Sequence, residues 1–250
     1  MSSRRSTEAP CGLSLSLDRG DDLAQDGSQR WVEDATRIML RPLASPLPLA
    51  FFAFGVGSLM TSGLQFGLIP QQESRELALI FGAFVFPPML LAAIFAFFGR
   101  ETLGATALGL ISFSWLTSAL VEYVAFPDPT TSALGMLDLA LALVLLCLGA
   151  IGLFGKPLLS VVILLAFFRY SLNGLYELTA SGGAQVASGI VGCIIFAFSL
   201  YGGLALGLED AQHRTVLPFG RRGEARRALE GDLSEQVGPV ESEAGVRKQL

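Results

Sequence analysis

The stretch from Ser45 to Gly67 limits the fold more than any other part of this chain. It reads SPLPLAFFAFGVGSLMTSGLQFG and contains no charged residue. An α-helix rises about 1.5 Å per residue, so about 20 apolar residues cross the hydrocarbon core of a bilayer, which is about 30 Å thick. We therefore interpret this stretch as a first membrane-spanning helix.

Five further apolar segments of spanning length follow it, at about Leu77–Phe98, Leu103–Phe126, Ala133–Leu153, Pro157–Tyr176 and Ala184–Leu208. Only 16% of the residues are charged, against about 25% in a typical soluble domain. The sequence predicts an all-α, multi-pass protein of the cell membrane, with six transmembrane helices in a bundle at residues 45–210. A polar N-terminal tail at residues 1–44 and a charged C-terminal tail at residues 211–250 flank this domain.

Two local patterns add detail. Pro87 and Pro88 lie in the middle of the second span, where they remove backbone donors and predict a kink.

Between Arg30 and Arg41, apolar residues recur at helical spacing. This pattern is consistent either with a short helix on the membrane surface or with a solvated linker, and the sequence leaves both open.

Basic residues near the span ends predict the orientation. Arg37 and Arg41 precede the first span, Arg100 follows the second and Lys156 follows the fourth. Five arginines lie at positions 214–227, just after the sixth span, whereas the alternate loops contain only Arg75 as a basic residue. By the positive-inside rule, both termini are cytoplasmic.

The chain carries no enzyme signature. It has no glycine-lysine nucleotide loop, no metal-ligand cluster and no nucleophile-histidine pair. We therefore expect no catalytic residues, no cofactor and no metal, and the net charge of -5 gives no indication of a nucleic-acid partner. The remaining classes are a channel or a secondary transporter in the lipid bilayer.

Three ionisable residues fall inside the spans. Glu122 and Asp138 lie near span ends, and we interpret both as reaching the headgroup region. Arg169 lies near the middle of the fifth span, where an unpaired charge costs at least about 2.5–3.5 kcal/mol. It is either a fixed cation for an anionic substrate, a structural partner of Glu122, Asp138 or Glu177, or an arginine whose charged end reaches a membrane interface. Polar side chains that are candidates to line a path are Ser62, Gln65, Ser112, Thr117 and Asn173.

Small residues recur at close-packing spacing in Gly63-x-x-x-Gly67 and Gly203-x-x-x-Gly207. Such pairs let helix backbones approach closely, either inside one bundle or between protomers. We favour packing inside the bundle for any single pair.

Two segments resemble signatures of the acetate uptake transporter family. Residues 45–55 resemble its N-P-x-P-L-G-L-x-x-F-G motif, with matches at Pro46, Pro48, Leu49, Phe54 and Gly55. The sixth span and the residues after it are similar to the family's glycine-rich last span and its N-E-x-x-G-R-x-x-L-P-x-G motif, with matches at Gly189, Gly192, Ala197, Tyr201, Arg214, Leu217, Pro218 and Gly220. Thr102, Gly104 and Trp115 are similar to residues of the third helix of that family.

The resemblance implies a six-helix protomer with cytoplasmic termini, assembled as a homo-oligomer that is often a hexamer with one path per protomer. It implies small carboxylates as substrates, commonly moved with a proton. An aromatic of the first signature helps to form a hydrophobic constriction in that family, and the matching residue here is Phe54.

The departures from the family pattern mark a divergent member. Ile111 stands where the constriction would have a tyrosine, and Met89 and Ala96 replace a usual glutamine and glutamate. Arg169 stands where a small apolar residue is usual, and we hypothesise that it holds a carboxylate by a two-pronged hydrogen bond. Ser45 and Ala50 replace the asparagine and the first glycine of the signature.

The sequence thus predicts a proton-coupled transporter for acetate or a similar small carboxylate. One alternative is a passive channel for small anions or ammonia, which dependence of flux on a proton gradient would distinguish. Another is a non-transporting membrane sensor or scaffold, supported only by the long polar tails.

Overall fold

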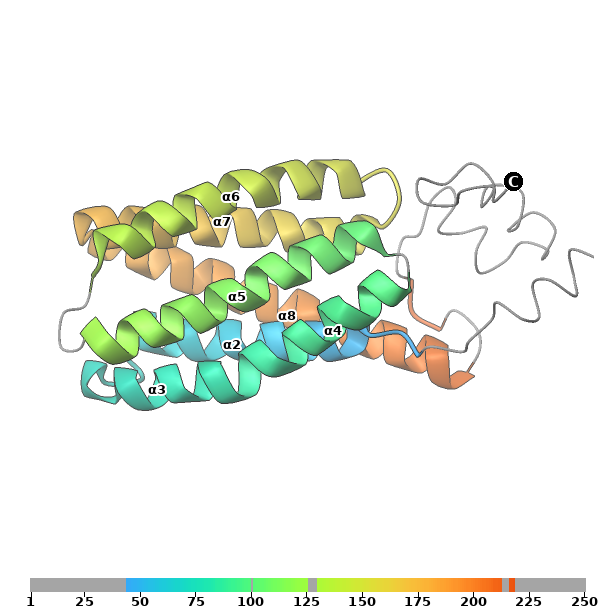
Figure 1. Ribbon diagram of the computed structural model, residues 1–250, viewed down its shortest axis with the longest axis horizontal. Helices are drawn as coiled ribbons and strands as arrows, with labels where there is room; N and C mark the ends of the chain where they lie inside the picture. The colour runs from blue at the N-terminus through green and yellow to red at the C-terminus, as the bar shows by residue number, and fades with distance from the viewer. Residues whose placement is uncertain (1–43, 100, 126–129, 213–215, 219–250) are drawn as a thin grey trace, which may run out of the picture. The chain divides into compact units, whose positions relative to one another are not determined.

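The computed structural model describes residues 44–99, 101–125, 130–212 and 216–218, which form a bundle of helices (Figure 1). Six helical segments in these ranges are long and apolar enough to cross a membrane. They are α2 (Leu47–Gln65), the composite segment Gln71–Phe98, α5 (Thr102–Ala125), α6 (Ser132–Gly152), α7 (Pro157–Thr179) and α8 (Gly182–Gln212). The predicted all-α, multi-pass architecture is confirmed, whereas residues 30–41, for which the sequence left a surface helix and a solvated linker open, lie outside the described residues.

Three helices extend beyond the limits that hydropathy predicts. The second span begins at the 3₁₀ turn η1 (Gln71–Glu73), and α8 continues past Leu208 to Gln212. The fifth continues to Thr179 and stops where Ala180 adopts a left-handed conformation, with φ of 53°. Hydropathy marks where a helix leaves lipid, but backbone hydrogen bonding continues into the polar residues beyond.

The second span is interrupted by a π-helical turn. It consists of α3 (Ser74–Ile80), the π turn η2 (Phe81–Val85) and α4 (Phe86–Phe98). Pro87 and Pro88 have no backbone N–H, so they cannot donate to the carbonyls four residues before them. The ladder is shifted just ahead of them, and the N–H of Phe86 donates to the carbonyl of Phe81, five residues back. The irregularity predicted at the two prolines therefore takes the form of a π turn.

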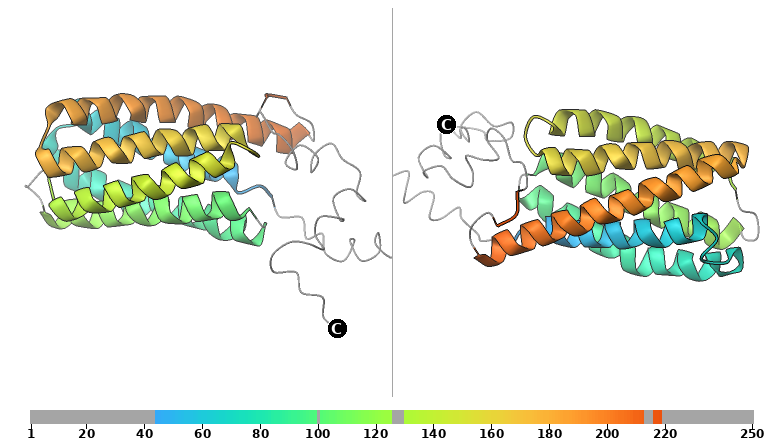
Figure 2. Two further views of the ribbon diagram at one scale, coloured as in Figure 1. Left: turned by 90° about the horizontal axis from the view of Figure 1, so that it is seen from above. Right: turned by 180° about the vertical axis from the view of Figure 1, so that it is seen from behind.

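The helices pack mainly in neighbouring pairs. α2 lies along α8, α6 along α7 and α4 along α5 (Figure 2). The start of α2 and the end of α8 lie at the same end of the bundle as the connection between α6 and α7 (Figure 1). We call this end the terminal end. The number of spans is even, so the chain enters α2 and leaves α8 at this same end of the bundle.

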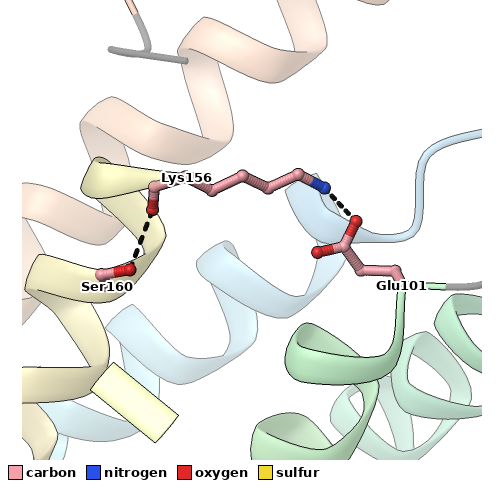
Figure 3. A network of polar contacts seen from close by, with 3 residues as sticks. All are labelled: Glu101, Lys156 and Ser160. Atoms are coloured by element: carbon pink, nitrogen blue, oxygen red, sulfur yellow. Dashed lines mark hydrogen bonds and ion pairs between the residues drawn. The ribbon is translucent and has the colours of Figure 1, made fainter. Parts of the chain in front are cut away.

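A polar network joins two connections at the terminal end (Figure 3). Lys156, between α6 and α7, forms an ion pair with Glu101, just before α5. The hydroxyl of Ser160 donates to the carbonyl oxygen of Lys156 at 3.1 Å. Because the ion pair is partly exposed, its contribution to stability is small.

Glycines let α6 and α7 approach closely. A Cβ at Gly174 would lie 2.9 Å from the carbonyl oxygen of Gly135 and 2.8 Å from the Cγ of Leu139. Gly203 is also covered, because a Cβ there would lie 2.6 Å from the ring of Phe52 on α2. By contrast, Gly207 has no neighbour of this kind within 4 Å. Packing inside the bundle therefore accounts for one member of the predicted Gly203–Gly207 pair.

The other predicted pair combines two roles. A Cβ at Gly63 would lie 3.2 Å from the side chain of Ile69, in the connection that follows α2. Gly67 has a φ of 73°, a left-handed conformation that favours glycine, and it lies just after the last residues of α2. Gly67 is therefore a helix-terminating residue rather than a packing residue.

We expect Gly174→Ala to destabilise the bundle, because the new methyl group forces the backbones of α6 and α7 apart. Overpacking of this kind costs about 1–3 kcal/mol. Thermal unfolding of the detergent-purified protein, followed by circular dichroism, should show a lower Tm. Gly207→Ala is the matched control, and it should leave the Tm unchanged or slightly raised. Equal Tm values for both variants and the unmodified protein would contradict the close approach.

Candidate functional site

A polar cavity of about 110 Å³ lies among α2, α5, α6, α7 and α8. We call it the polar cavity. Four charged side chains line it, namely Glu122, Asp138, Arg169 and Glu177. Aromatic rings also line it, those of Phe54, Phe81, Trp115, Tyr170 and Tyr176. A site for one water needs about 10–15 Å³, so the cavity is large enough for a ligand of several heavy atoms.

Arg169 is the cation of this cavity. It comes from the middle of α7 and is only 2% exposed. Its Nη1 donates to the hydroxyl of Ser62 on α2 at 3.4 Å, whereas its Nη2 is buried with no hydrogen-bond partner. Within the described part of the chain, no carboxylate forms an ion pair with Arg169. A buried N–H donor without a partner raises the free energy of the folded protein, so binding of an acceptor at Nη2 is favourable.

Gly192 makes room for the guanidinium. This glycine lies on α8, and a Cβ there would overlap both Nη1 of Arg169 and the hydroxyl of Ser62. Ser62 in turn donates to the carbonyl of Ser58 at 2.8 Å. Arg169 therefore extends from α7 into the contact between α2 and α8. Ser62 accepts its hydrogen bond on one side, and the absence of a side chain at Gly192 leaves room for the guanidinium on the other.

A layer of amides lies one turn further along α7. Nε2 of Gln65 donates to Oδ1 of Asn173 at 2.9 Å and to the hydroxyl of Ser188 at 3.2 Å. The Ser188 hydroxyl donates to the same Asn173 oxygen at 2.5 Å. Oε1 of Gln65 is buried without a partner. Gln65 and Asn173 both line the polar cavity.

The carboxylates of the cavity correct one sequence interpretation. Asp138 is only 4% exposed, and Oε2 of Glu122 is buried without a partner, so these side chains face the cavity and not the headgroup region. Position along the helix predicted their depth, but it did not predict which way they point. Glu177 accepts a hydrogen bond from the backbone N–H of Thr131 at 2.6 Å.

A second cavity, of about 30 Å³, lies nearer the terminal end. Its lining is apolar and includes Leu47, Phe51, Met89, Ile111 and Leu159. We call it the apolar cavity. Phe54 lines both cavities, and its ring meets that of Trp115 edge-on, with centroids 6.5 Å apart. Phe54 therefore lies between the polar and the apolar cavity.

Apart from Phe54, the signature residues described below lie at helix ends and helix contacts rather than in the cavities. Pro46 caps the start of α2, Pro48 lies in its first turn, and Leu49 points outward with 42% exposure. A Cβ at Gly55 would lie 3.0 Å from Ser199 on α8. The hydroxyl of Tyr201 donates to the carbonyl of Pro218 at 2.9 Å, which joins two signature positions. Arg214 lies outside the described residues.

Comparison with solved structures identifies the fold of this chain. No family model and no curated protein matched the chain. Among solved structures, the bacterial acetate channel SatP matches with a TM-score of 0.64 and 21% sequence identity, over 71% of this chain and 99% of that chain. The chain therefore has the fold of this channel, which agrees with the family that residues 45–55 and 210–220 resemble.

We expect Gly192→Ala to lower the Tm, because the methyl group collides with the guanidinium of Arg169. The cost should be about 1–3 kcal/mol, as for other overpacked sites. In an Arg169→Ala background the collision with the guanidinium is gone, so the same glycine substitution should cost about 0.5–3 kcal/mol less. Thermal unfolding of the four proteins of this double-mutant cycle measures the difference, and strictly additive effects would contradict the contact.

Proposed function

We propose that the chain is a proton-coupled transporter for acetate or a similar small carboxylate. We place it in the cell membrane with cytoplasmic termini, as a homo-oligomer of the hexameric kind that the family resemblance implies. The observation that carries the proposal is the buried, unpartnered Nη2 of Arg169 on the wall of the polar cavity. The fold shared with an acetate channel supports it.

Arg169 supplies the chemistry for holding a carboxylate. A guanidinium presents parallel N–H groups that match two carboxylate oxygens, and charged hydrogen bonds of this type are roughly twice as strong as neutral ones. Nη1 already has the Ser62 hydroxyl at 3.4 Å, a long contact, while Nη2 has none. A carboxylate in the polar cavity would satisfy the free donor and neutralise a charge that is costly inside a membrane.

Phe54 and Ile111 are suited to form the constriction. The polar cavity lies toward Gln185 and Glu177, whereas the apolar cavity lies toward Leu47 and the terminal end. A solute that passes from one to the other must move the ring of Phe54. An apolar constriction of this kind gates by excluding water. The resulting path runs from the Arg169 site past Phe54 to the apolar cavity and Ile111.

The proposal is tested by uptake of labelled acetate into liposomes that contain the purified protein, with and without an imposed proton gradient. We expect accumulation above equilibrium when the gradient is present. Arg169→Ala should reduce uptake at least tenfold, because a carboxylate loses its charged partner. Flux that only equilibrates would favour the passive channel.

Arg75→Ala is the matched control for this experiment. It also removes one positive charge, but Arg75 is exposed and does not line either cavity. Uptake should remain near that of the unmodified protein. Normal uptake by a well-folded Arg169→Ala protein would contradict the role of Arg169, and absence of acetate flux in the unmodified protein would favour the sensor or scaffold.

We expect Phe54→Ala to weaken the gate. Removing the ring joins the two cavities, so acetate should equilibrate faster and gradient-driven accumulation should fall. Phe52→Ala is the control, because Phe52 lies on the same helix but packs against Gly203 of α8. Stopped-flow measurement of acetate entry into liposomes checks the rate. An unchanged or lower rate in Phe54→Ala, with normal folding, would contradict the constriction.

A further inference from the structure

The polar cavity holds a buried cationic side chain and two buried carboxyl side chains that lack hydrogen-bond partners among the described residues. Arg169 offers a free Nη2, and Glu122 has a buried Oε2 without a partner. Asp138 is 4% exposed and has no hydrogen bond to any residue in the described ranges. Arg169 and Asp138 line the same cavity, yet within the described residues they do not form an ion pair. Buried opposite charges that are close but not in contact leave room for a ligand between them.

Arg169 and the three carboxyl groups of the polar cavity come from different places in the bundle. Arg169 and Glu177 are on the same face of α7, eight residues and so about 12 Å apart along the helix. Asp138 comes from α6 and Glu122 from α5. A Cβ at Gly135 of α6 would lie 2.9 Å from the Cβ of Glu177, and a Cβ at Gly174 of α7 would lie 2.8 Å from the Cγ of Leu139, so Asp138 is level with the part of α7 between Arg169 and Glu177. A ligand on Arg169 therefore meets Asp138 first.

A simple monocarboxylate matches only half of this site. Its anionic group would satisfy Arg169, but the rest of the ligand would then face Asp138, Glu122 and Glu177 with nothing to offer them. Like charges placed close together in a site of low dielectric repel strongly. A ligand with an ammonium group next to its carboxylate would satisfy both signs and would add no net charge to the cavity.

We propose that the polar cavity selects a small zwitterionic amino acid, with its carboxylate on Arg169 and its ammonium group on Asp138. This inference rests on the proposed carboxylate transport and names the substrate class of that site. Phe54, Phe81 and Trp115 line the same cavity, so the side chain of the ligand must be small and apolar, as in glycine or alanine. The volume of about 110 Å³ suits a molecule of this size.

The test compares labelled glycine with labelled glycolate in liposomes at neutral pH. The two molecules have the same number of non-hydrogen atoms and the same carboxylate, and they differ in an ammonium group against a hydroxyl. We expect glycine uptake to be at least tenfold faster than glycolate uptake. Acetate uptake is measured in the same liposomes.

Asp138→Asn probes the ammonium contact. It keeps the shape of the side chain and removes its charge, so glycine uptake should fall at least tenfold while glycolate uptake should be unchanged or higher. Glu76→Gln is the control, because Glu76 is exposed on α3 and does not line the polar cavity. Both fluxes should stay as in the unmodified protein.

The outcomes separate this inference from the proposed function. Acetate and glycolate flux with no faster glycine flux would overturn the zwitterion site and leave carboxylate transport standing. Absence of flux for all three solutes would overturn the proposed function itself. Equal loss of glycine and glycolate uptake in Asp138→Asn would assign this carboxylate to folding or proton transfer and would overturn the ammonium contact. The ratio of glycine to glycolate in the unmodified protein decides the question even where the variant fails to fold.

Discussion

A guanidinium buried in the middle of a membrane helix must be compensated by its surroundings, and much of the bundle around Arg169 is arranged accordingly. Leaving such a charge unpaired in lipid costs at least about 2.5–3.5 kcal/mol. α8 contributes a glycine where any side chain would collide with the guanidinium, and α2 contributes the Ser62 hydroxyl. α7 then continues with Asn173, which ties it to Gln65 and Ser188. The compensation is incomplete at Nη2, and the incomplete part faces the polar cavity.

The interior contains one cavity with a polar lining and one with an apolar lining, and Phe54 lines both. Glycines at the α6–α7 contact bring the backbones of these helices together. The ring of Phe54 packs edge-on against Trp115, whose ring also meets Phe81 with centroids 4.8 Å apart. In the proposed transport, a solute bound at Arg169 would have to leave that contact before it passes the ring of Phe54.

Much of the fold could be predicted from the sequence, because the requirement that backbone groups be satisfied in lipid makes long apolar segments into helices. All six segments appear at nearly the predicted positions. The π turn before Pro87 and the polar extension of α8 were not predicted, because both depend on hydrogen bonds and not on hydropathy. For the site, Arg169 and Gln65 stood out as polar residues in apolar spans, and both line the polar cavity. Asp138 and Glu122 were assigned to the headgroup region, because helix rotation is set by packing partners that a single sequence does not reveal.

Gly192, in the last span, has a structural role that its sequence pattern does not indicate. Gly192 enters the sequence comparison only as one match in a glycine-rich helix, a pattern that close helix packing alone explains. In the structure it is the position that admits an arginine from another helix. The arginine and the bare backbone are therefore a coupled pair, since the guanidinium occupies the space that a side chain at position 192 would need. Arg169 on α7 thus depends on a glycine on α8, and the two together give this cavity a cation that a helix of small apolar residues would lack.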